Sequence, residues 1–358
     1  MTVVVAEPTP PGPAELLAAR ALVASMHPRT PLRRLRHWVG CDSDLYVKCE
    51  DETEIRSFKW RGALWRLARL EESGPGRGVI TASTGNHGQG VAYAAAHFGT
   101  RSVIVVPEGA SELKMDRIRS LGGELRVVGA DIGEASDEAY KASEREGLTY
   151  LEDGDDPALM AGAATVAWEI LEELPGVDQI VVPVGGGNLI AGVALMAKRL
   201  KPTIKVVGVQ SEAAPAVARS WEEGRVVELP CRTSAGGLAT RFPGRLAFDV
   251  IQELVDEMCL VSEAEITREI HYALATRATL IEGAAAAPFA ALRRYGDGWP
   301  KGCTVLVQSG ANISLAELQT VLTAGSGDGK MASSTEPGRP LVPASNSRPA
   351  GTEPQKAG

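Results

Sequence analysis

The sequence has few aromatic residues, few cysteines and no surplus of positive charge. Aromatic residues make up 5% of the 358 positions. The 5 cysteines are odd in number and form no C-x-x-C pair, which excludes a disulfide framework and a zinc knuckle and is typical of a reducing cytosol. The net charge of -8 leaves no basic stripe for a nucleic acid. We therefore expect a cytoplasmic protein with no nucleic-acid partner.

Long apolar runs are also absent. None approaches the length of about 20 residues that a membrane-spanning helix needs, so we expect no membrane partner. The first residues lack the basic region and apolar core of a secretory signal, and we expect residues 1–15 to be flexible. Residues 325–358 are rich in Gly, Ser, Pro and Thr. Such a segment buries too little surface to offset its ordering entropy, which predicts a disordered tail.

What the chain does contain is a regular alternation of strand-like and helix-like segments. Apolar residues make up 44% and charged residues 23%, as in ordinary globular proteins, and the length suggests two domains. The predicted strands are short, β-branched and almost continuously apolar: 79–81, 102–107, 124–129, 148–152, 179–185, 204–210, 258–262 and 304–310. Amphipathic segments separate them. This pattern predicts an α/β protein with doubly wound parallel sheets covered on both faces.

Glycine is abundant, with 39 residues, and several follow predicted strands directly. Gly85, the run 185–187 and Gly310 all lie where open parallel sheets bind ligands. One such loop is typical of a tight turn, but three together predict a ligand cleft. The dinucleotide fingerprint fails because Ile190 stands in place of its third glycine, and no P-loop occurs. The run 185–188 still opens a predicted helix, 189–200, and so offers a nest for one phosphate.

A lysine stands at the start of another predicted helix, in the run S-F-K-W-R-G-A over 57–63. Ser57 is the expected N-cap, and apolar residues follow at helical spacing. The helix macrodipole disfavours a cation at Lys59, which makes the neutral amine more accessible, and a Schiff-base lysine needs that state. For an isolated lysine, a solvated side chain is the alternative interpretation.

The run S-T-G-N-H-G-Q-G over 83–90 precedes a third predicted helix. Its hydroxyls, its amide and its free backbone N–H groups could bind a carboxylate. The alternative is a capped helix in which His87 only packs or forms a hydrogen bond.

These three motifs, in this order, resemble the serine/threonine dehydratase group of fold type II pyridoxal-phosphate enzymes, from Arg29 to about Ser314. The resemblance implies two doubly wound, open parallel-sheet domains with the cofactor, pyridoxal 5′-phosphate, in the cleft between them. It implies a large cofactor-binding domain over 16–59 and 151–324 and a small inserted domain over 60–150. A homodimer is the expectation for this group.

The resemblance also implies roles for individual residues. Lys59 would form the Schiff base and act as the base at Cα, and Thr84 stands where racemases carry a second base. The other implied cofactor-binding residues are Phe58, Asn86, Gly185, Gly186, Gly187, Asn188, Leu189, Glu282 and Ser309. The implied substrate-binding residues are Ser83, Thr84, Gly85, Asn86, His87 and Gly154.

The expected reaction is α,β-elimination of water from a β-hydroxy amino acid such as L-threonine or L-serine, giving a 2-oxo acid and ammonia. Ser309 is neutral and does not enforce protonation of the pyridine ring, which favours expulsion of a β-substituent over transamination. The alternatives are a racemase, a β-replacing or threonine-synthase-like enzyme, and a non-catalytic α/β ligand-binding protein. Threonine, serine, hydroxyaspartate, phenylserine and a pathway-specific amino acid all remain open as the substrate.

Three departures from the group's pattern bear on the site. Gln210 and Ala216 replace the two acids of the racemase metal site, so we predict no metal. Where the group often has H-P-F-D-D-P, this chain has E-D-G-D-D-P over 152–157. Where the group has A-D-G-L-A, this chain has A-G-G-L-A over 235–239 and lacks the acid. Gly154 in place of a bulky residue predicts room for a larger or more polar substituent. The alternative is that the acids of 152–157 form a surface loop and a helix cap.

Overall fold

The computed structural model describes residues 8–36, 44–74, 76–324 and 340–341. Most of the predicted tail therefore lies outside the described residues. Within that tail, the N–H of Leu341 donates to the carbonyl of Met258 at 2.9 Å, which forms an antiparallel bridge to a sheet edge. At the other end, helix α1 (Pro13–Met26) begins inside the segment predicted to be flexible, because Pro13 supplies a favourable first residue.

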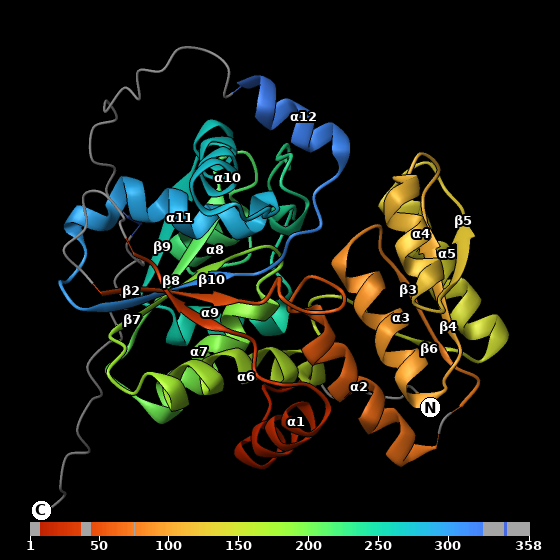
Figure 1. Ribbon diagram of the computed structural model, residues 1–358. Coiled ribbons are helices and arrows are strands. Elements are labelled where there is room, and N and C mark those ends of the chain that lie inside the picture. Colours follow the sequence, from red (N-terminus) through yellow and green to blue (C-terminus); the bar gives the residue numbers. More distant parts are fainter. Residues whose placement is uncertain (1–7, 37–43, 75, 325–339, 342–358) are drawn as a thin grey trace, which may run out of the picture.

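Two sheets organise the molecule (Figure 1). The larger has the order β1-β2-β10-β7-β8-β9 and the smaller the order β5-β4-β3-β6. The strands of the larger sheet are β1 (Leu32–Arg34), β2 (Asp44–Cys49), β7 (Gln179–Pro183), β8 (Lys205–Ser211), β9 (Glu257–Val261) and β10 (Cys303–Gln308). Those of the smaller are β3 (Val79–Ala82), β4 (Ser102–Val106), β5 (Glu124–Val127) and β6 (Thr149–Tyr150). The two-sheet α/β fold predicted from the sequence is confirmed.

One strand pair departs from the predicted parallel arrangement. β1 pairs antiparallel with β2, whereas the other neighbouring strands are parallel. Too few residues separate β1 from β2 for a parallel crossover, which needs a dozen or more. Both strands were missed in the sequence, because β1 carries two arginines and β2 carries a lysine, Lys48, in its interior.

Helices cover both faces of each sheet, as in a doubly wound fold. In the larger sheet, α11 packs on the strands from one side, and α6 and α7 lie on the other (Figure 1). The remaining helices are α2 (Lys59–Ser73), α3 (Asn86–Phe98), α4 (Glu112–Ser120), α5 (Ile132–Glu146), α6 (Pro157–Glu173), α7 (Asn188–Leu200), α8 (Ala216–Glu223), α9 (Arg245–Leu254), α10 (Glu263–Arg277), α11 (Gly283–Tyr295) and α12 (Leu315–Ala324). β3 to β6 all come from residues 79–150. The division into an inserted domain over 60–150 and a large domain stays a prediction.

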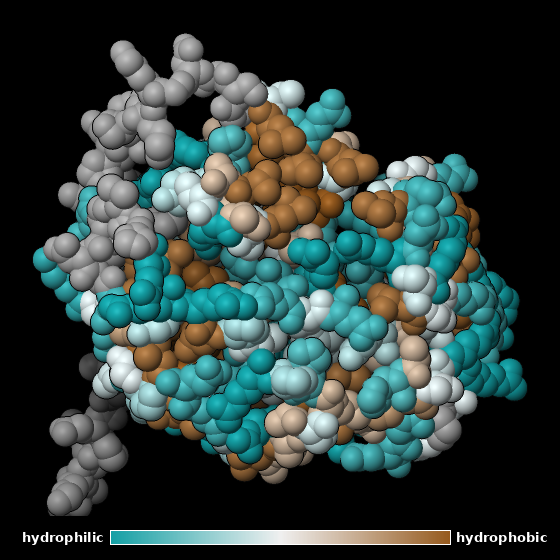
Figure 2. Space-filling view, in the orientation of Figure 1, coloured by the Kyte–Doolittle hydropathy of each residue, from teal (hydrophilic) through white to brown (hydrophobic). Residues whose placement is uncertain are grey.

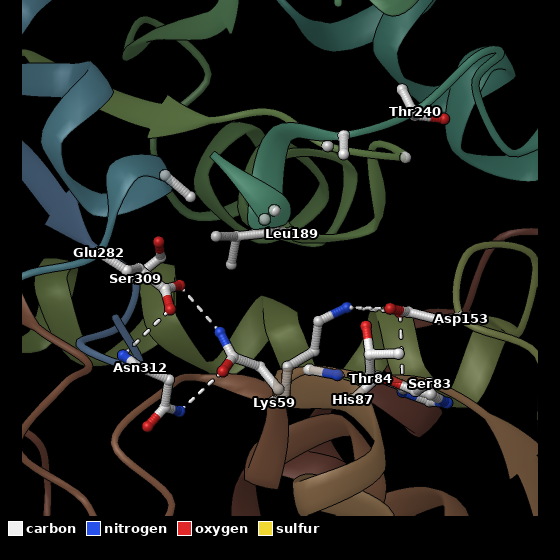
Figure 3. Close-up of a pocket in the computed structure, with 18 of the residues that line it drawn as sticks. Lys59, Ser83, Thr84, His87, Asp153, Leu189, Thr240, Glu282, Ser309 and Asn312 are labelled. Atoms are coloured by element: carbon white, nitrogen blue, oxygen red, sulfur yellow. Dashed lines mark hydrogen bonds and ion pairs between the residues drawn. The ribbon is translucent and has the colours of Figure 1, made fainter. Parts of the chain in front are cut away.

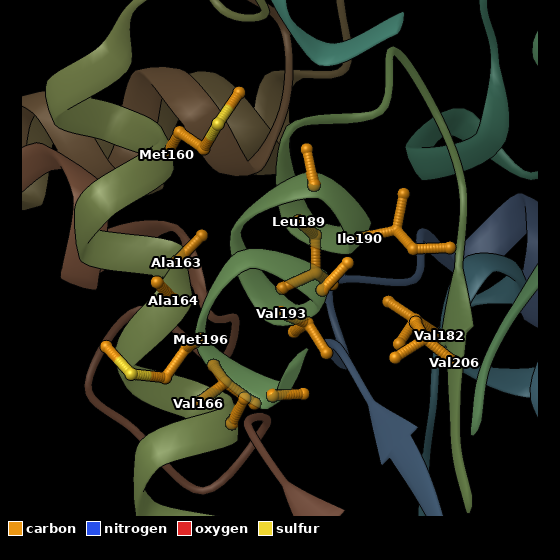
Figure 4. Close-up of a cluster of buried hydrophobic side chains, with 14 of the residues drawn as sticks. Met160, Ala163, Ala164, Val166, Val182, Leu189, Ile190, Val193, Met196 and Val206 are labelled. Atoms are coloured by element: carbon orange, nitrogen blue, oxygen red, sulfur yellow. The ribbon is translucent and has the colours of Figure 1, made fainter. Parts of the chain in front are cut away.

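The main core lies between helices α6 and α7 and strands β7 and β8 (Figure 4). Small residues there allow the helices to approach closely. A Cβ placed on Gly162 of α6 would lie 2.4 Å from the Cα of Gly62 in α2. Glycine therefore also serves helix packing here, a use that the strand-end pattern did not predict. This contact fixes α2, and with it Lys59, against the larger sheet's helices.

A buried charge cluster ties the same helix to the sheet. Arg61 is fully buried and donates to Glu50, which directly follows β2, and to Glu169 of α6, in both cases at 2.7 Å. Lys48 donates to Glu169 at 2.6 Å. Burial alone would raise the pKa of Glu169, but the charges of Arg61 and Lys48 outweigh it and hold this pKa at about 2. We call these four residues the buried ion cluster.

Among the residues that the structure describes, we find no helix with both the length and the apolar character required to cross a membrane.

Candidate functional site

A cavity of about 370 Å³ lies between the two sheets, beyond the carboxyl ends of their strands. Its walls come from the start of α2, the β3–α3 loop, the β7–α7 loop, the turn at 236–238 and the end of β10. All the residues predicted to form a site line this one cavity: Phe58, Lys59, Ser83, Thr84, Gly85, Asn86, His87, Gly154, Gly185, Gly186, Gly187, Asn188, Leu189, Glu282 and Ser309. Their individual roles stay predictions.

Lys59 is the first residue of α2, and its side chain is 20% exposed. Phe58, not Ser57, is the N-cap. The predicted cap is wrong, because Ser57 bridges to Gly310 in extended backbone and its buried Oγ has no partner among the described residues. The Nζ of Lys59 donates to both carboxylate oxygens of Asp153, at 2.5 and 2.7 Å. This ion pair places a carboxylate against the amine, a contact that the sequence did not predict.

Asp153 is the main site residue that the sequence did not single out. Burial alone would raise its pKa, but the charge of Lys59 outweighs burial and lowers this pKa to about 2. Its side chain is 35% exposed and faces the cavity. His87 approaches it, with Nδ1 3.7 Å from Oδ1. Burial lowers the pKa of His87, so that its imidazole is neutral near pH 7 and its attraction to Asp153 is weak.

One wall of the cavity is a glycine cradle at the start of α7. Gly187 has φ +107°, a left-handed conformation that favours glycine, and nothing lies within 4 Å of a Cβ placed on Gly186. The Oδ1 of Asn188 is buried without a partner among the described residues. Free N–H groups at a helix N-terminus beside open space are a ready site for one phosphate.

The end of the cavity away from Asp153 holds a chain of amides and a carboxylate (Figure 3). Asn86 donates to Glu282 at 2.8 Å and accepts from Asn312 at 2.7 Å, and the N–H of Asn312 donates to Glu282 at 3.1 Å. Burial raises the pKa of Glu282, although these hydrogen bonds oppose the shift. The Oγ of Ser309 nearby is buried and has no partner among the described residues. A buried hydroxyl of this kind suits a ring nitrogen of a bound ligand.

The residues fit pyridoxal phosphate. A lysine amine, a phosphate cradle and an orphan hydroxyl line one cavity, and they match the carbonyl, the phosphate and the ring nitrogen of that molecule. Fold and site together define a cofactor-dependent α/β enzyme with an amine at the reacting end.

Comparison with known proteins identifies the family. Residues 23–310 match the family described as "Pyridoxal-phosphate dependent enzyme", and the chain belongs to it. Its cofactor is pyridoxal 5′-phosphate. The chain is similar to L-threonine ammonia-lyase of Geobacter sulfurreducens, with 40% identity over 284 residues, 78% of this chain and 70% of that one. It is also similar to the catabolic L-threonine dehydratase TdcB of Escherichia coli (strain K12), with 32% identity over 86% of this chain and 94% of that one.

Solved structures agree with this assignment. The processed form of threonine deaminase isoform 2 from Solanum lycopersicum has a TM-score of 0.81 and 32% identity, covering 89% of this chain and 96% of that one. Maize serine racemase has a TM-score of 0.81 and 28% identity, covering 87% and 97%. The resemblance inferred from the three motifs is confirmed.

The three departures noted in the sequence can now be located. Gln210 is buried, and its Oε1 accepts a hydrogen bond from the N–H of Ala218 at 3.0 Å, so the amide meets the first turns of α8. The described ranges contain no group of three or more metal-ligating residues, and the absence of a metal stays a prediction. Gly154 and Gly236 both line the cavity, with nothing within 4 Å of an added Cβ.

Proposed function

We propose that this protein is an ammonia-lyase that eliminates water from a β-hydroxy amino acid such as L-threonine or L-serine. The amino acid loses the proton on Cα and the hydroxyl on Cβ as water, and hydrolysis of the product gives a 2-oxo acid and ammonia. The observation that carries this proposal is the Nζ of Lys59 in one cavity with a phosphate cradle and the Ser309 hydroxyl. The names of the relatives, L-threonine ammonia-lyase and L-threonine dehydratase, support it.

When bound, pyridoxal phosphate supplies an electron sink for negative charge at Cα of the amino acid. The cradle at 185–188 would hold its phosphate, and Lys59 would hold its carbonyl carbon. The Ser309 hydroxyl would meet the ring nitrogen. A neutral hydroxyl does not enforce a proton on that nitrogen, so charge at Cα is less delocalised and expels a β-substituent more readily.

Lys59 is the residue we assign to the proton at Cα. Its amine lies at the start of α2, held by the packing of that helix on α6. The same amine can take the Cα proton once it is free, because a base needs only hydrogen-bond reach of about 3 Å.

The β3–α3 loop is the site we assign to the substrate carboxylate. Ser83 and Thr84 offer hydroxyls there, and the first N–H groups of α3 have no partners within the helix. The partial positive charge of a helix N-terminus favours an anion. The neutral His87 adds a hydrogen-bonding group without a charge, since burial lowers its pKa.

The direct test is an amino-acid panel followed for 2-oxo acid and ammonia. We expect equimolar 2-oxo acid and ammonia from L-threonine or L-serine, and neither from their D-enantiomers. Chiral analysis of unreacted serine tests the racemase alternative, for which Thr84 lines the cavity. Absence of 2-oxo acid with every β-hydroxy amino acid would refute the lyase proposal.

We also propose that the protein forms a homodimer in the cytoplasm. Apolar side chains gather on the face around α12 (Figure 2), where Leu315 is 77% exposed. Exposed apolar patches of this kind often mark an interface. Sedimentation at micromolar concentration should give twice the monomer mass, whereas a monomer at all concentrations would contradict this.

A further inference from the structure

We propose that Asp153 sets the charge preference of the substrate side chain: it admits a neutral or cationic group on Cβ and rejects a carboxylate. The inference rests on the proposed function, because it assumes that an amino acid reacts beside Lys59. It narrows the substrates left open above by excluding those with an acidic side chain.

The position of Asp153 follows from its contact with the reacting amine. Its two oxygens lie 2.5 and 2.7 Å from the Nζ of Lys59. A base that takes the Cα proton lies within about 3 Å of it. The carboxylate of Asp153 is therefore within a few ångströms of any group attached to Cβ.

Asp153 loses its main partner when the site is in use. The ion pair with Lys59 holds it in the cofactor-free protein. In the loaded protein the Nζ would be joined to the carbonyl carbon of the cofactor, and once free it must be a neutral amine to take the Cα proton, so in neither state does it offer Asp153 an ammonium partner. His87, its other neighbour, is neutral near pH 7, since burial lowers its pKa. The carboxylate then faces the cavity as an uncompensated negative charge.

Other charged groups of the lining do not change this conclusion. Lys114, Glu282 and Glu317 also line the cavity, but no contact joins Asp153 to them. Glu282 is buried and receives hydrogen bonds from Asn86 and from the backbone of Asn312. Asp153 is therefore the acid at the reacting end.

Size alone would not exclude an acidic side chain. Gly154 follows Asp153 directly, and an atom placed at its Cβ position would meet nothing within 4 Å. Gly236, which also lines the cavity, has equally open space at its Cβ position. The cavity thus has room beside Asp153, and charge is left as the criterion. A β-hydroxyl or a β-ammonium group can donate to the carboxylate, whereas a second carboxylate is repelled.

The experiment compares binding of L-asparagine and L-aspartate to the cofactor-loaded protein by calorimetry. The two ligands match in size and differ in charge, and neither has a leaving group on Cβ, so binding is measured without turnover. We expect the wild type to bind L-asparagine at least about tenfold more tightly than L-aspartate, as like charges a few ångströms apart imply. Asp153→Asn should bring the ratio close to one.

Glu152→Gln is the matched control, because it removes a neighbouring charge that lies outside the cavity lining. It should leave the ratio at its wild-type value. Equal binding of both ligands by the wild type, or an unchanged ratio in Asp153→Asn, would overturn the inference. If that occurs while L-serine still gives a 2-oxo acid, the inference alone fails. Absence of binding by either ligand together with absence of 2-oxo acid would overturn the proposed function as well.

Discussion

Lys59 and Arg61 lie two residues apart in α2, and each is the centre of a cluster of charged side chains. The two clusters differ in whether the protein alone supplies partners for all their polar groups. Arg61 is fully buried, and its guanidinium is paired with the carboxylates of Glu50, directly after β2, and Glu169 of α6. Lys59 has one carboxylate, Asp153, in an open cavity that also holds unpartnered polar atoms of Asn188 and Ser309. A cluster that the protein satisfies by itself serves the fold. A cluster beside open space, among polar atoms that lack partners, indicates a binding site for a ligand that would supply those partners.

The largest expected effect is on activity at the open cluster. Lys59→Ala should lower turnover of L-threonine or L-serine by at least about 10³-fold, because it removes both the covalent anchor and the base. Thermal unfolding should remain cooperative, since the side chain is partly exposed. Lys141→Ala, an exposed lysine of α5, is the control and should keep wild-type turnover. Full activity in Lys59→Ala would refute the assignment.

The next effect is on stability at the closed cluster. Arg61→Met should lower the free energy of unfolding by about 3–5 kcal/mol, because Glu50 and Glu169 lose the charge that compensates their burial. Arg69→Met on the same helix breaks an exposed pair with Glu72 and a cation–π contact with Trp65, and it should cost less than about 1 kcal/mol. Denaturant unfolding measures both. Equal losses would mean that the buried ion cluster is not what holds α2.

A smaller effect is expected at Ser309, where a substitution should change the affinity for the cofactor without lowering the stability of the fold. Ser309→Ala should weaken pyridoxal-phosphate binding by about fivefold, the value of one neutral hydrogen bond. The cofactor-free protein should keep its stability or gain slightly, because the buried hydroxyl has no partner among the described residues. Equilibrium titration and thermal unfolding give the two quantities. Loss of stability with unchanged cofactor affinity would show that Ser309 serves the fold.

The smallest effect is a pH dependence of the cofactor-free protein. Asp153 has its pKa lowered to about 2, from a usual value near 4. Its contribution to stability is thus present above about pH 4 and is lost as the pH falls through about 2. The side chain is 35% exposed, so we expect less than about 1 kcal/mol. Between pH 5 and pH 2.5, Asp153→Asn should lose less stability than the wild type; identical losses would contradict the ion pair.

Features encoded by short runs of residues could be predicted from the sequence, whereas contacts between residues far apart in the chain could not. β-Branched runs marked the strands between residues 79 and 310, and local motifs marked the residues that line the cavity. The pairing of Lys59 with Asp153 joins residues 94 apart, and that of Asn86 with Asn312 joins residues 226 apart. No local pattern encodes such contacts. Asp153 lies in an acidic run that is also typical of a surface loop. Only the folded structure shows that its side chain faces the cavity beside Lys59.

The buried ion cluster was missed for a related reason. Asp44 and Lys48 leave β2 an apolar run of only three residues, which weakened its strand signal. Arg61 lies in the motif that identified the site, yet nothing in the motif distinguishes a buried arginine from an exposed one. Its burial depends on Glu169, far along the chain in α6.

The attachment point of the cofactor decides whether Lys59 is the Schiff-base lysine. The purified protein, loaded with pyridoxal phosphate and reduced with borohydride, should carry the cofactor's mass on the peptide that contains Lys59. We expect one labelled lysine, at that position. A label on Lys114, which lines the same cavity, or no stable label at all would contradict it.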